Sequence, residues 1–223
     1  MTNIIKDFNS FARSEGISSL KMDYHQKFQN SLTPMILETS EMRVTQMSVF
    51  DRLMMDRVIW IAGTVNDYMS TIVQAQLMFL DNDSNTDITM HIDTGGGSVK
   101  SGLSIVDVMN YITSDITTIN TGIAASMGSI LLGAGTKTKR HTLNFSKVML
   151  HQVSSGMDGS LIDLQISLSQ AKMYNDILFE LLGEYTNKDP EQVKLDANRD
   201  YWLTSKEALD YGIVDSIIHK KKK

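Results

Sequence analysis

The sequence predicts an α/β protein whose strands are mostly parallel and covered by helices. Two observations carry this prediction: from Val58 onward, short apolar runs alternate with helical patterns, and the alternation is repeated along the chain. The chain has 223 residues, enough to bury one substantial core, and nothing in it reads as a linker between independent domains. We therefore expect one domain with appendages.

The predicted elements follow one another in a βα rhythm. Strands are expected at 58–62, 88–92, 116–119 and 148–150, and helices at 67–80, at 99–112 and directly after Ser126. We expect Asp67 to cap the first of these helices. Near the C-terminus, Thr204 and Glu207 resemble a capping box, and Gly212 should end the helix that follows. Catalytic loops are expected at strand ends.

A long helix is predicted after a small, polar stretch at 153–160. Its apolar residues recur with helical spacing from Leu161 to Leu181. A long helix added outside a compact βα unit projects from the core, and its apolar stripe finds a partner most readily in another subunit. We therefore expect a homo-oligomer.

Composition excludes several classes of function. The formal net charge is -5, with acidic and basic residues interspersed, so the surface lacks the positive field that nucleic-acid binding requires. No segment is long enough to cross a membrane, and the first residues lack the continuous apolar stretch of a secretory signal. The chain has no cysteine, which excludes disulfides, thiol catalysis and cysteine-bound zinc. We expect a cytoplasmic protein without nucleic-acid or membrane partners.

Both ends of the chain are expected to lie outside the core. Residues 1–31 hold few branched apolar residues and read either as a removable prosegment with a short amphipathic helix or as a disordered tail. Residues 220–223 are four lysines, a solvated tail to which we assign no function.

Ser126, His151 and Asp200 are the candidate catalytic residues, and their order suggests a serine hydrolase. A hydroxyl is a poor nucleophile at neutral pH, so catalysis needs an imidazole that takes its proton and a carboxylate that fixes the imidazole's tautomer. Small residues before Ser126 permit a tight turn from strand to helix, and the first helical turn offers free N–H donors to an oxyanion. Asp196 and Asp215 compete for the carboxylate role, and composition does not decide between them.

Three consecutive glycines, Gly95 to Gly97, follow one predicted strand and precede a helix. A backbone at such a place can approach a ligand closely and offer its N–H groups. A nucleotide site is disfavoured, because the chain has no Gly-x-x-x-x-Gly-Lys-Ser/Thr motif and Lys100 stands where a dinucleotide fingerprint needs its last glycine. An oxyanion loop is preferred; without Ser126, the default would be a flexible turn. No spacing of the histidines indicates a metal site.

Three segments resemble the catalytic motifs of the ClpP family, the proteolytic subunits of the Clp protease. They are Gly-Ile-Ala-Ala-Ser-Met-Gly-Ser at 122–129, Val-Met-Leu-His-Gln at 148–152 and Arg-Asp-Tyr-Trp-Leu-Thr at 199–204. Segments 32–38 and 52–57 resemble the mature start and the first helix of ClpP, particularly of forms from Bacteroidota. The match favours Asp200 over Asp196 and implies a peptidase domain at 32–219.

The resemblance implies a serine endopeptidase of ClpP/crotonase-like fold, with repeated β-β-α and β-α units and a protruding handle helix and strand at about 153–185. Two heptameric rings of identical subunits would stack and enclose the active sites. A separate AAA+ unfoldase, ClpX-like, would use ATP to feed unfolded polypeptide into the chamber, and the chain itself would need no cofactor.

The same match implies roles for further residues. Gly97 and Met127 would supply the backbone N–H groups of the oxyanion hole. The other implied groups are a substrate-binding strand at Val153, Ser154, Ser155 and Gly156, ring-interface residues Asn198 and Arg199, and unfoldase-docking residues Thr89, His91, Tyr111 and His141.

Two departures from the family pattern remove a proline. The family's Ser-Pro-Gly-Gly-Ser loop reads Thr94-Gly-Gly-Gly-Ser98, and its His-Gln-Pro-Leu-Gly-Gly segment reads His151-Gln-Val-Ser-Ser-Gly156. Because proline fixes the backbone, we expect a more pliable loop and an altered cleavage preference.

Two further departures concern partners. Asn198 replaces the usual acid before Arg199, which removes an ion pair across the ring interface. Polar Thr89, His91 and His141 replace apolar rings in the docking pocket, so we expect an unusual unfoldase or a mixed ring.

Three alternatives remain at this point. A noncatalytic or regulatory ring subunit would keep these residues in an inactive geometry. A ClpP-like phage capsid-maturation protease would use the same chemistry without an unfoldase. An acyl-CoA-binding enzyme of the crotonase fold would use the glycine loop to stabilise an enolate, which the matched motifs disfavour.

Overall fold

The structure is a computed structural model that describes residues 35–40, 43–154, 156 and 158–219, with side chains from Met47 onward. The chain divides into two compact units, Met1–Asp56 and Arg57–Lys223. The predictions for residues 1–31, Ser155 and the lysine tail lie outside the described residues.

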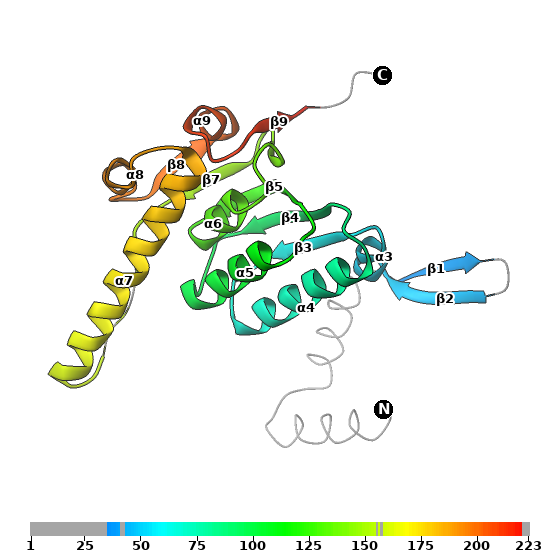
Figure 1. The fold of residues 1–223 in the computed structure, drawn as a ribbon, viewed down its shortest axis with the longest axis horizontal. Coiled ribbons are helices and arrows are strands. Elements are labelled where there is room, and N and C mark those ends of the chain that lie inside the picture. Colours follow the sequence, from blue (N-terminus) through cyan, green and yellow to red (C-terminus); the bar gives the residue numbers. More distant parts are fainter. Residues whose placement is uncertain (1–34, 41–42, 155, 157, 220–223) are drawn as a thin grey trace, which may run out of the picture. The chain divides into compact units, whose positions relative to one another are not determined.

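In its described part, the first unit contains a hairpin and a short helix (Figure 1). β1 (Met35–Ser40) and β2 (Arg43–Ser48) pair antiparallel, and α3 (Val49–Met55) follows directly. Ser48 and Asp51 form a capping box, in which each backbone N–H donates to the other residue's side chain at 3.1 Å. These bonds satisfy N–H groups that the first turn of α3 leaves without helical partners.

The second unit is built on one mixed sheet (Figure 1). Its strands are β3 (Val58–Ala62), β4 (Ile88–Thr94), β5 (Ile116–Ala125), β6 (Arg140–Leu143), β7 (Lys147–Leu150), β8 (Tyr201–Thr204) and β9 (Ser216–Ile218). Strands β3, β4, β5, β6 and β9 lie in that order and are parallel. β7 pairs parallel with the end of β5, and β8 pairs antiparallel with β7. The prediction of a mostly parallel sheet is confirmed.

Helices cover one face of this sheet. α4 (Asp67–Asp83), α5 (Val99–Tyr111) and α6 (Met127–Gly133) pack against the strands and against one another (Figure 1). Ile59 and Ile61 of β3 are buried, whereas Trp60 between them is 39% exposed. β4 alternates in the same way, so the sheet has one helix-covered face and one face that the described residues leave partly open.

Capping residues set the helix boundaries. α9 (Ser205–Tyr211) begins with the predicted box of Thr204 and Glu207, and Gly212, at φ 91°, ends it. The prediction for α4 is wrong by one residue. Asn66 is the cap, because its side-chain oxygen accepts from the N–H three residues on at 2.9 Å, and Asp67 is the first helical residue.

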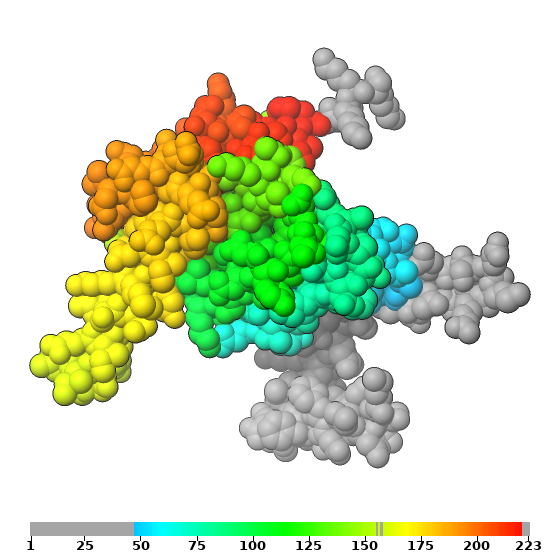
Figure 2. All heavy atoms as spheres, in the orientation of Figure 1, coloured from blue at the N-terminus to red at the C-terminus, as the bar shows by residue number. Residues whose placement is uncertain are grey.

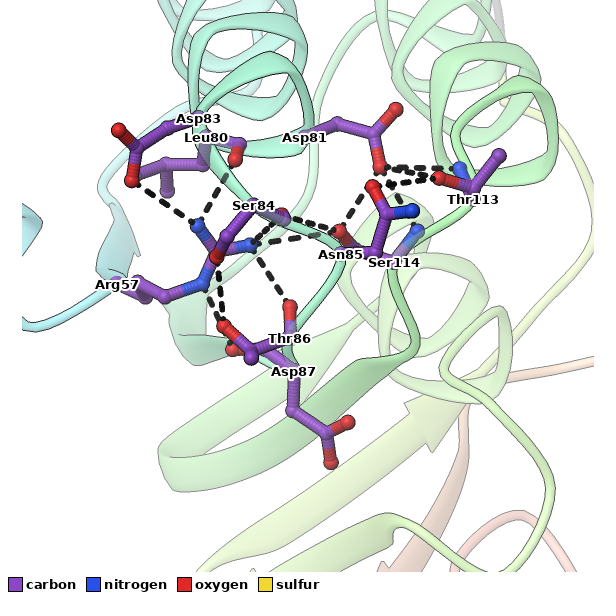
Figure 3. A network of polar contacts seen from close by, with 10 residues as sticks. All are labelled: Arg57, Leu80, Asp81, Asp83, Ser84, Asn85, Thr86, Asp87, Thr113 and Ser114. Atoms are coloured by element: carbon purple, nitrogen blue, oxygen red, sulfur yellow. Dashed lines mark hydrogen bonds and ion pairs between the residues drawn. The ribbon is translucent and has the colours of Figure 1, made fainter.

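Arg57 is the first residue of the second unit, and its side chain is hydrogen-bonded to the end of α4 and to the loop that leads to β4 (Figure 3). Its guanidinium donates at 2.7 to 3.2 Å to the backbone carbonyls of Leu80, Ser84, Thr86 and Asp87. Nearby, Asp81 accepts from the N–H and hydroxyl groups of Thr113 and Ser114. Burial raises the pKa of Asp81, but these hydrogen bonds outweigh it and lower the pKa overall. The network fixes the ends of α4 and α5 beside the start of the sheet.

α7 (Leu161–Thr186) is the long helix that the sequence predicts. Figure 2 shows its first turns standing clear of the rest of the second unit. Leu161 is 73% exposed and Ile162 67%, whereas Phe179 and Leu182 in the second half are buried. α8 (Pro190–Asp196) packs against α7. The predicted projecting helix is confirmed, and half of it is left without a partner in the described chain.

Candidate active site

Ser126 lies at the junction between β5 and α6. Ala124 and Ala125 end the strand, and Ser126 turns the chain with φ 54° and ψ -123°, a conformation that residues other than glycine rarely adopt. Two bonds hold the turn: Ser126 N donates to Met149 O at 2.9 Å, and Ser129 Oγ donates to Ser126 O at 2.7 Å. The hydroxyl of Ser126 therefore stands at the N-terminus of α6 in a fixed turn.

His151 directly follows β7 and Asp200 directly precedes β8, and these two strands are paired. β7 ends at Leu150 and β8 begins at Tyr201, and these two residues lie opposite each other in the ladder. His151 Nε2 is 2.9 Å from Ser126 Oγ, and His151 Nδ1 is 3.2 Å from Asp200 Oδ1. A proton on Nδ1 donates to Asp200 and leaves Nε2 free to accept from the serine hydroxyl. The structure thus brings the three predicted residues together.

The two competing carboxylates have other partners. Asp196 accepts from the hydroxyl of Tyr211 at 2.9 Å. Asp215 accepts from the backbone and guanidinium of Arg140, whose side chain is 5% exposed. Burial raises the pKa of Asp215, but the bonds from Arg140 outweigh it and lower the pKa overall. Geometry therefore selects Asp200 as the partner of His151.

The glycine loop packs against the N-terminus of α6. A methyl group added at Gly96, where φ is 91°, would lie 2.7 Å from Ser126 Cβ and 2.9 Å from Met127 N. One added at Gly97 would overlap the backbone of Val65. Within the described residues, no hydrogen bond occupies the N–H groups of Gly97 and Met127. Met127 directly follows Ser126, and Gly97 lines the same small cavity as Ser126, so both N–H groups are candidates for the predicted oxyanion hole.

Side-chain and backbone bonds pin this loop without a proline. Thr94 Oγ1 donates to Gly63 O and accepts from Gly96 N at 3.0 Å. Val65 N donates to Gly96 O at 2.9 Å, and Ser98 N donates to Val65 O at 2.8 Å. These bonds constrain the loop where the family has a proline, and the expectation of a more pliable loop stays a prediction.

A small cavity of about 50 Å³ opens beside Ser126 and His151. Apolar side chains of three helices line it, together with the segment that follows His151; they are Val99, Ile130, Leu178, Leu182 and Val153. The described part of the predicted substrate-binding strand, Val153, Ser154 and Gly156, forms no strand here. A strand needs a neighbouring strand to pair with, and no β-ladder among the described residues includes Val153 or Ser154.

Gln152 fastens the segment after His151 to the segment that leads to Asp200. Its backbone N donates to Ala197 O at 3.1 Å, and its side chain donates to Asn198 O at 3.2 Å. Asn198 contributes its backbone carbonyl here, so this contact does not depend on an acid at that position. Arg199 is exposed and, within the described residues, forms no ion pair. Sequence reasoning missed the contribution of Gln152, although its place directly after His151 could have indicated it.

Two of the predicted docking residues lie in one row across the sheet. His91 of β4 and His141 of β6 flank Ile119 of β5. The His91 ring stacks on Trp60, with centroids 4.6 Å apart and planes at 17°. Burial lowers the pKa of His91, and its Nδ1 has no hydrogen-bond partner among the described residues. His141 Nδ1 is 2.7 Å from Ser216 Oγ.

The other two predicted docking residues occupy different places. Thr89 lies two residues before His91 on the same face of β4. Tyr111 ends α5 and is 78% exposed. Sequence reasoning missed Trp60, which keeps an aromatic ring on this face. Its alternation with buried Ile59 and Ile61 was the available signal.

The described residues contain no metal-binding cluster and no candidate membrane span. No three His, Cys, Asp or Glu side chains among them gather to hold an ion. None of their helices combines the length and the apolar content that crossing a bilayer requires.

Fold and site together define a class of protein. An α/β sheet presents a serine at a strand-to-helix turn, a histidine and an aspartate bonded in series, and a glycine loop with free donors, which is the arrangement of a serine hydrolase. The sequence profile described as Clp protease matches residues 40–221. The chain belongs to the Clp protease family.

Similar proteins from Bacteroidota agree with this assignment. The chain is 42% identical over 222 residues to the ATP-dependent Clp protease proteolytic subunit of Porphyromonas gingivalis, covering 98% of this chain and 100% of that protein. Proteins of the same name from Bacteroides fragilis and Bacteroides thetaiotaomicron are 41% identical over 218 residues, covering 96% of this chain and 99% of theirs. The predicted resemblance to ClpP is confirmed.

Proposed function

We propose that this chain is the serine endopeptidase core of a self-compartmentalised protease, which hydrolyses unfolded proteins to short peptides when an ATP-driven unfoldase feeds it. One observation carries the proposal: Ser126 Oγ, His151 and Asp200 form a hydrogen-bonded chain with distances of 2.9 and 3.2 Å. The relatives named as proteolytic subunits support the same reaction for this chain.

The proposed reaction follows from this geometry. Ser126 Oγ attacks the peptide carbonyl while its proton passes to His151 Nε2, and Asp200 accepts from Nδ1–H and stabilises the imidazolium that forms. The imidazolium then gives its proton to the departing amine, which leaves an acyl-enzyme on Ser126. Water, deprotonated by His151, attacks this ester, and the serine recovers its proton as the acid product departs.

The carbonyl oxygen gains negative charge in each attack, and we assign its stabilisation to the N–H groups of Gly97 and Met127. Both donors lie beside Ser126 and are free within the described residues. Met127 is the first residue of α6, so the helix adds the partial positive charge of its N-terminus. Donors fixed before the reaction stabilise the transition state without reorganising, and one such donor is typically worth about 10² to 10³ in rate.

The cavity beside Ser126 favours a substrate with one apolar side chain next to the scissile bond. Leu178, Leu182 and Ile130 offer it no charged partner. Ser129, Gln152 and Ser154 add polar groups to the lining but no opposite charge, so a charged side chain would lose much of its hydration there. We therefore propose cleavage after residues of modest apolar size.

Assembly is part of the proposal: a homo-oligomer of two stacked heptameric rings. The first half of α7 exposes Leu161, Ile162 and Ile166, a stripe that a second subunit would cover. The Asp200 side chain is 62% exposed, and such an exposed contact to His151 contributes little until a neighbour excludes water. Protein degradation should therefore need the assembled particle.

The partner would be an AAA+ unfoldase, ClpX-like, that consumes ATP in the cytoplasm. This chain has no Gly-x-x-x-x-Gly-Lys-Ser/Thr motif of its own. We place docking on the open face of the sheet at Thr89, His91 and His141, with Trp60 supplying an aromatic ring and Tyr111 exposed at the end of α5. This mixed polar and aromatic face would favour a docking loop that can donate hydrogen bonds as well as bury apolar area.

Peptidase assays on four proteins test the proposed function. Wild type should cleave a fluorogenic apolar peptide, Ser126→Ala should lose turnover while keeping its native mass, and Asp200→Asn should fall by about 10³ to 10⁴. Asp196→Asn is the matched control, because Asp196 bonds to Tyr211 and not to His151. Undiminished cleavage by Ser126→Ala would refute the nucleophile, and equal losses in the two aspartate variants would refute the role of Asp200.

A further inference from the structure

We infer that Asn175 of α7 is a positioning residue that sets the width of the substrate cavity beside Ser126. The inference rests on the proposed peptidase function. It starts from one hydrogen bond, in which Val153 N donates to Asn175 Oδ1 at 3.0 Å. This bond joins the segment that follows His151 to the helix that forms the opposite wall of the cavity.

The helical spacing places Asn175 directly beside that wall. Leu178 and Leu182 lie three and seven residues further along α7, so they share a helix face with Asn175. Both leucines line the cavity of about 50 Å³, and Val153 lines it from the facing segment. The hydrogen bond between Asn175 and Val153 therefore fixes the distance between α7 and the segment that follows His151.

Open space lies behind the segment that Asn175 holds. A second cavity of about 540 Å³ is lined by Val153, Gln152 and Asn175 together with Leu168 and Ala171. Gln152 and Val153 line both cavities, so the segment is a partition between them. Gln152 is anchored to residues 197 and 198, and Val153 borders the larger cavity. Without the bond, the segment is free to move into the larger space and widen the smaller one.

Val153 and Asn175 act as a matched pair of donor and acceptor. A partly buried N–H needs an acceptor, since leaving it unpaired costs free energy. Proline at position 153 would remove this donor and fix the backbone by its ring. The hydrogen bond to Asn175 therefore restrains the backbone at position 153, as the ring of a proline would restrain it covalently. In a Val153→Pro chain, the N–H that donates to Asn175 is absent.

The variants follow from this pairing. Asn175→Leu keeps the side chain's bulk and removes the acceptor, whereas Asn175→Asp keeps an acceptor oxygen. Gln170→Leu is the matched control, because Gln170 is an exposed polar residue of the same helix that lines neither cavity. A net hydrogen bond corresponds to about fivefold in an equilibrium constant. We expect Asn175→Leu to reduce the kcat/KM ratio between a small and a bulky apolar peptide by about this factor.

Two measurements on the full-length protein decide the inference. Hydrogen exchange should show lost protection at Val153 in Asn175→Leu, and wild-type protection in Asn175→Asp and Gln170→Leu. The peptide ratio should fall in Asn175→Leu alone, mainly through KM, and Asn175→Leu should have no further effect in a Val153→Pro background.

Unchanged protection and peptide ratio in Asn175→Leu would overturn the inference. So would an equal loss in the Val153→Pro background, because Asn175 would then act through something other than this bond. A wild type that cleaves neither peptide would refute the proposed function, and the exchange at Val153 would still decide whether Asn175 holds the segment.

Discussion

Replacing Gly96 by alanine should damage the active site far more than the same change at Gly95. At φ 91° an alanine costs about 1–2 kcal/mol, because its Cβ crowds the following carbonyl. The new methyl would also lie 2.7 Å from Ala125 O and from Ser126 Cβ, an overpacking that costs about 1–3 kcal/mol. The sum is a loss of about 2–5 kcal/mol in the free energy of unfolding.

The same methyl should displace Ser126. A shift of about 1 Å in a reacting group lowers rate by about 10², so Gly96→Ala should label with a fluorophosphonate about a hundredfold more slowly. Gly95→Ala is the matched control, since a methyl there meets nothing within 4 Å. Urea unfolding and the labelling rate measure both effects. Wild-type labelling in Gly96→Ala, or an equal loss in Gly95→Ala, would refute the close packing of this loop on the nucleophile.

Three further variants test the framework, each by urea unfolding. Asp215→Asn should destabilise the protein by about 3 kcal/mol, because it leaves the charge of buried Arg140 without its partner; a loss below 1 kcal/mol would contradict this. Arg57→Ala should cost about 1.5–3 kcal/mol, since carbonyls at the end of α4 lose a charged donor, and unchanged stability would count against the network in Figure 3. Burial lowers the pKa of His91 below its value in the unfolded chain, which is about 6.5. The unfolded chain therefore binds more protons at this residue below that pH. The contribution of the neutral ring to the free energy of unfolding is complete above about pH 6.5 and is lost as the pH falls. His91→Phe should flatten this acid-side loss, and an unchanged pH profile would contradict it.

Apolar periodicity predicted the bounds of the apolar strand β3 correctly, but it underestimated the length of β5, which contains several polar residues. β3 was expected at 58–62 and is found at Val58–Ala62. β5 was expected to end at Ile119 but continues to Ala125. Polar residues hide the extension from the pattern: Asn120 donates to Lys147 O and Thr121 donates to Ile92 O. Such partners come from distant segments, so sequence periodicity cannot show them.

The sequence indicated the candidate catalytic residues but not the hydrogen bonds that hold the surrounding loops in place. The order of Ser126 and His151 indicated the chemistry, whereas the choice of Asp200 needed the resemblance and, in the structure, the pairing of β7 with β8. The anchoring bonds of Thr94 and Asn175 were missed. Each joins residues that are distant in sequence or act through the backbone, and neither kind of contact leaves a spacing pattern.

Incubation of the purified full-length protein with a fluorophosphonate probe tests most directly whether Ser126 is an activated nucleophile. The labelled residue is located by mass spectrometry, and native mass spectrometry gives the size of the same sample, with Ser126→Ala as the control. The proposed mechanism predicts one label, on Ser126, in a large ring assembly, and none in the variant. An assembled ring without a label on Ser126, or a label of equal strength in the variant, would contradict it.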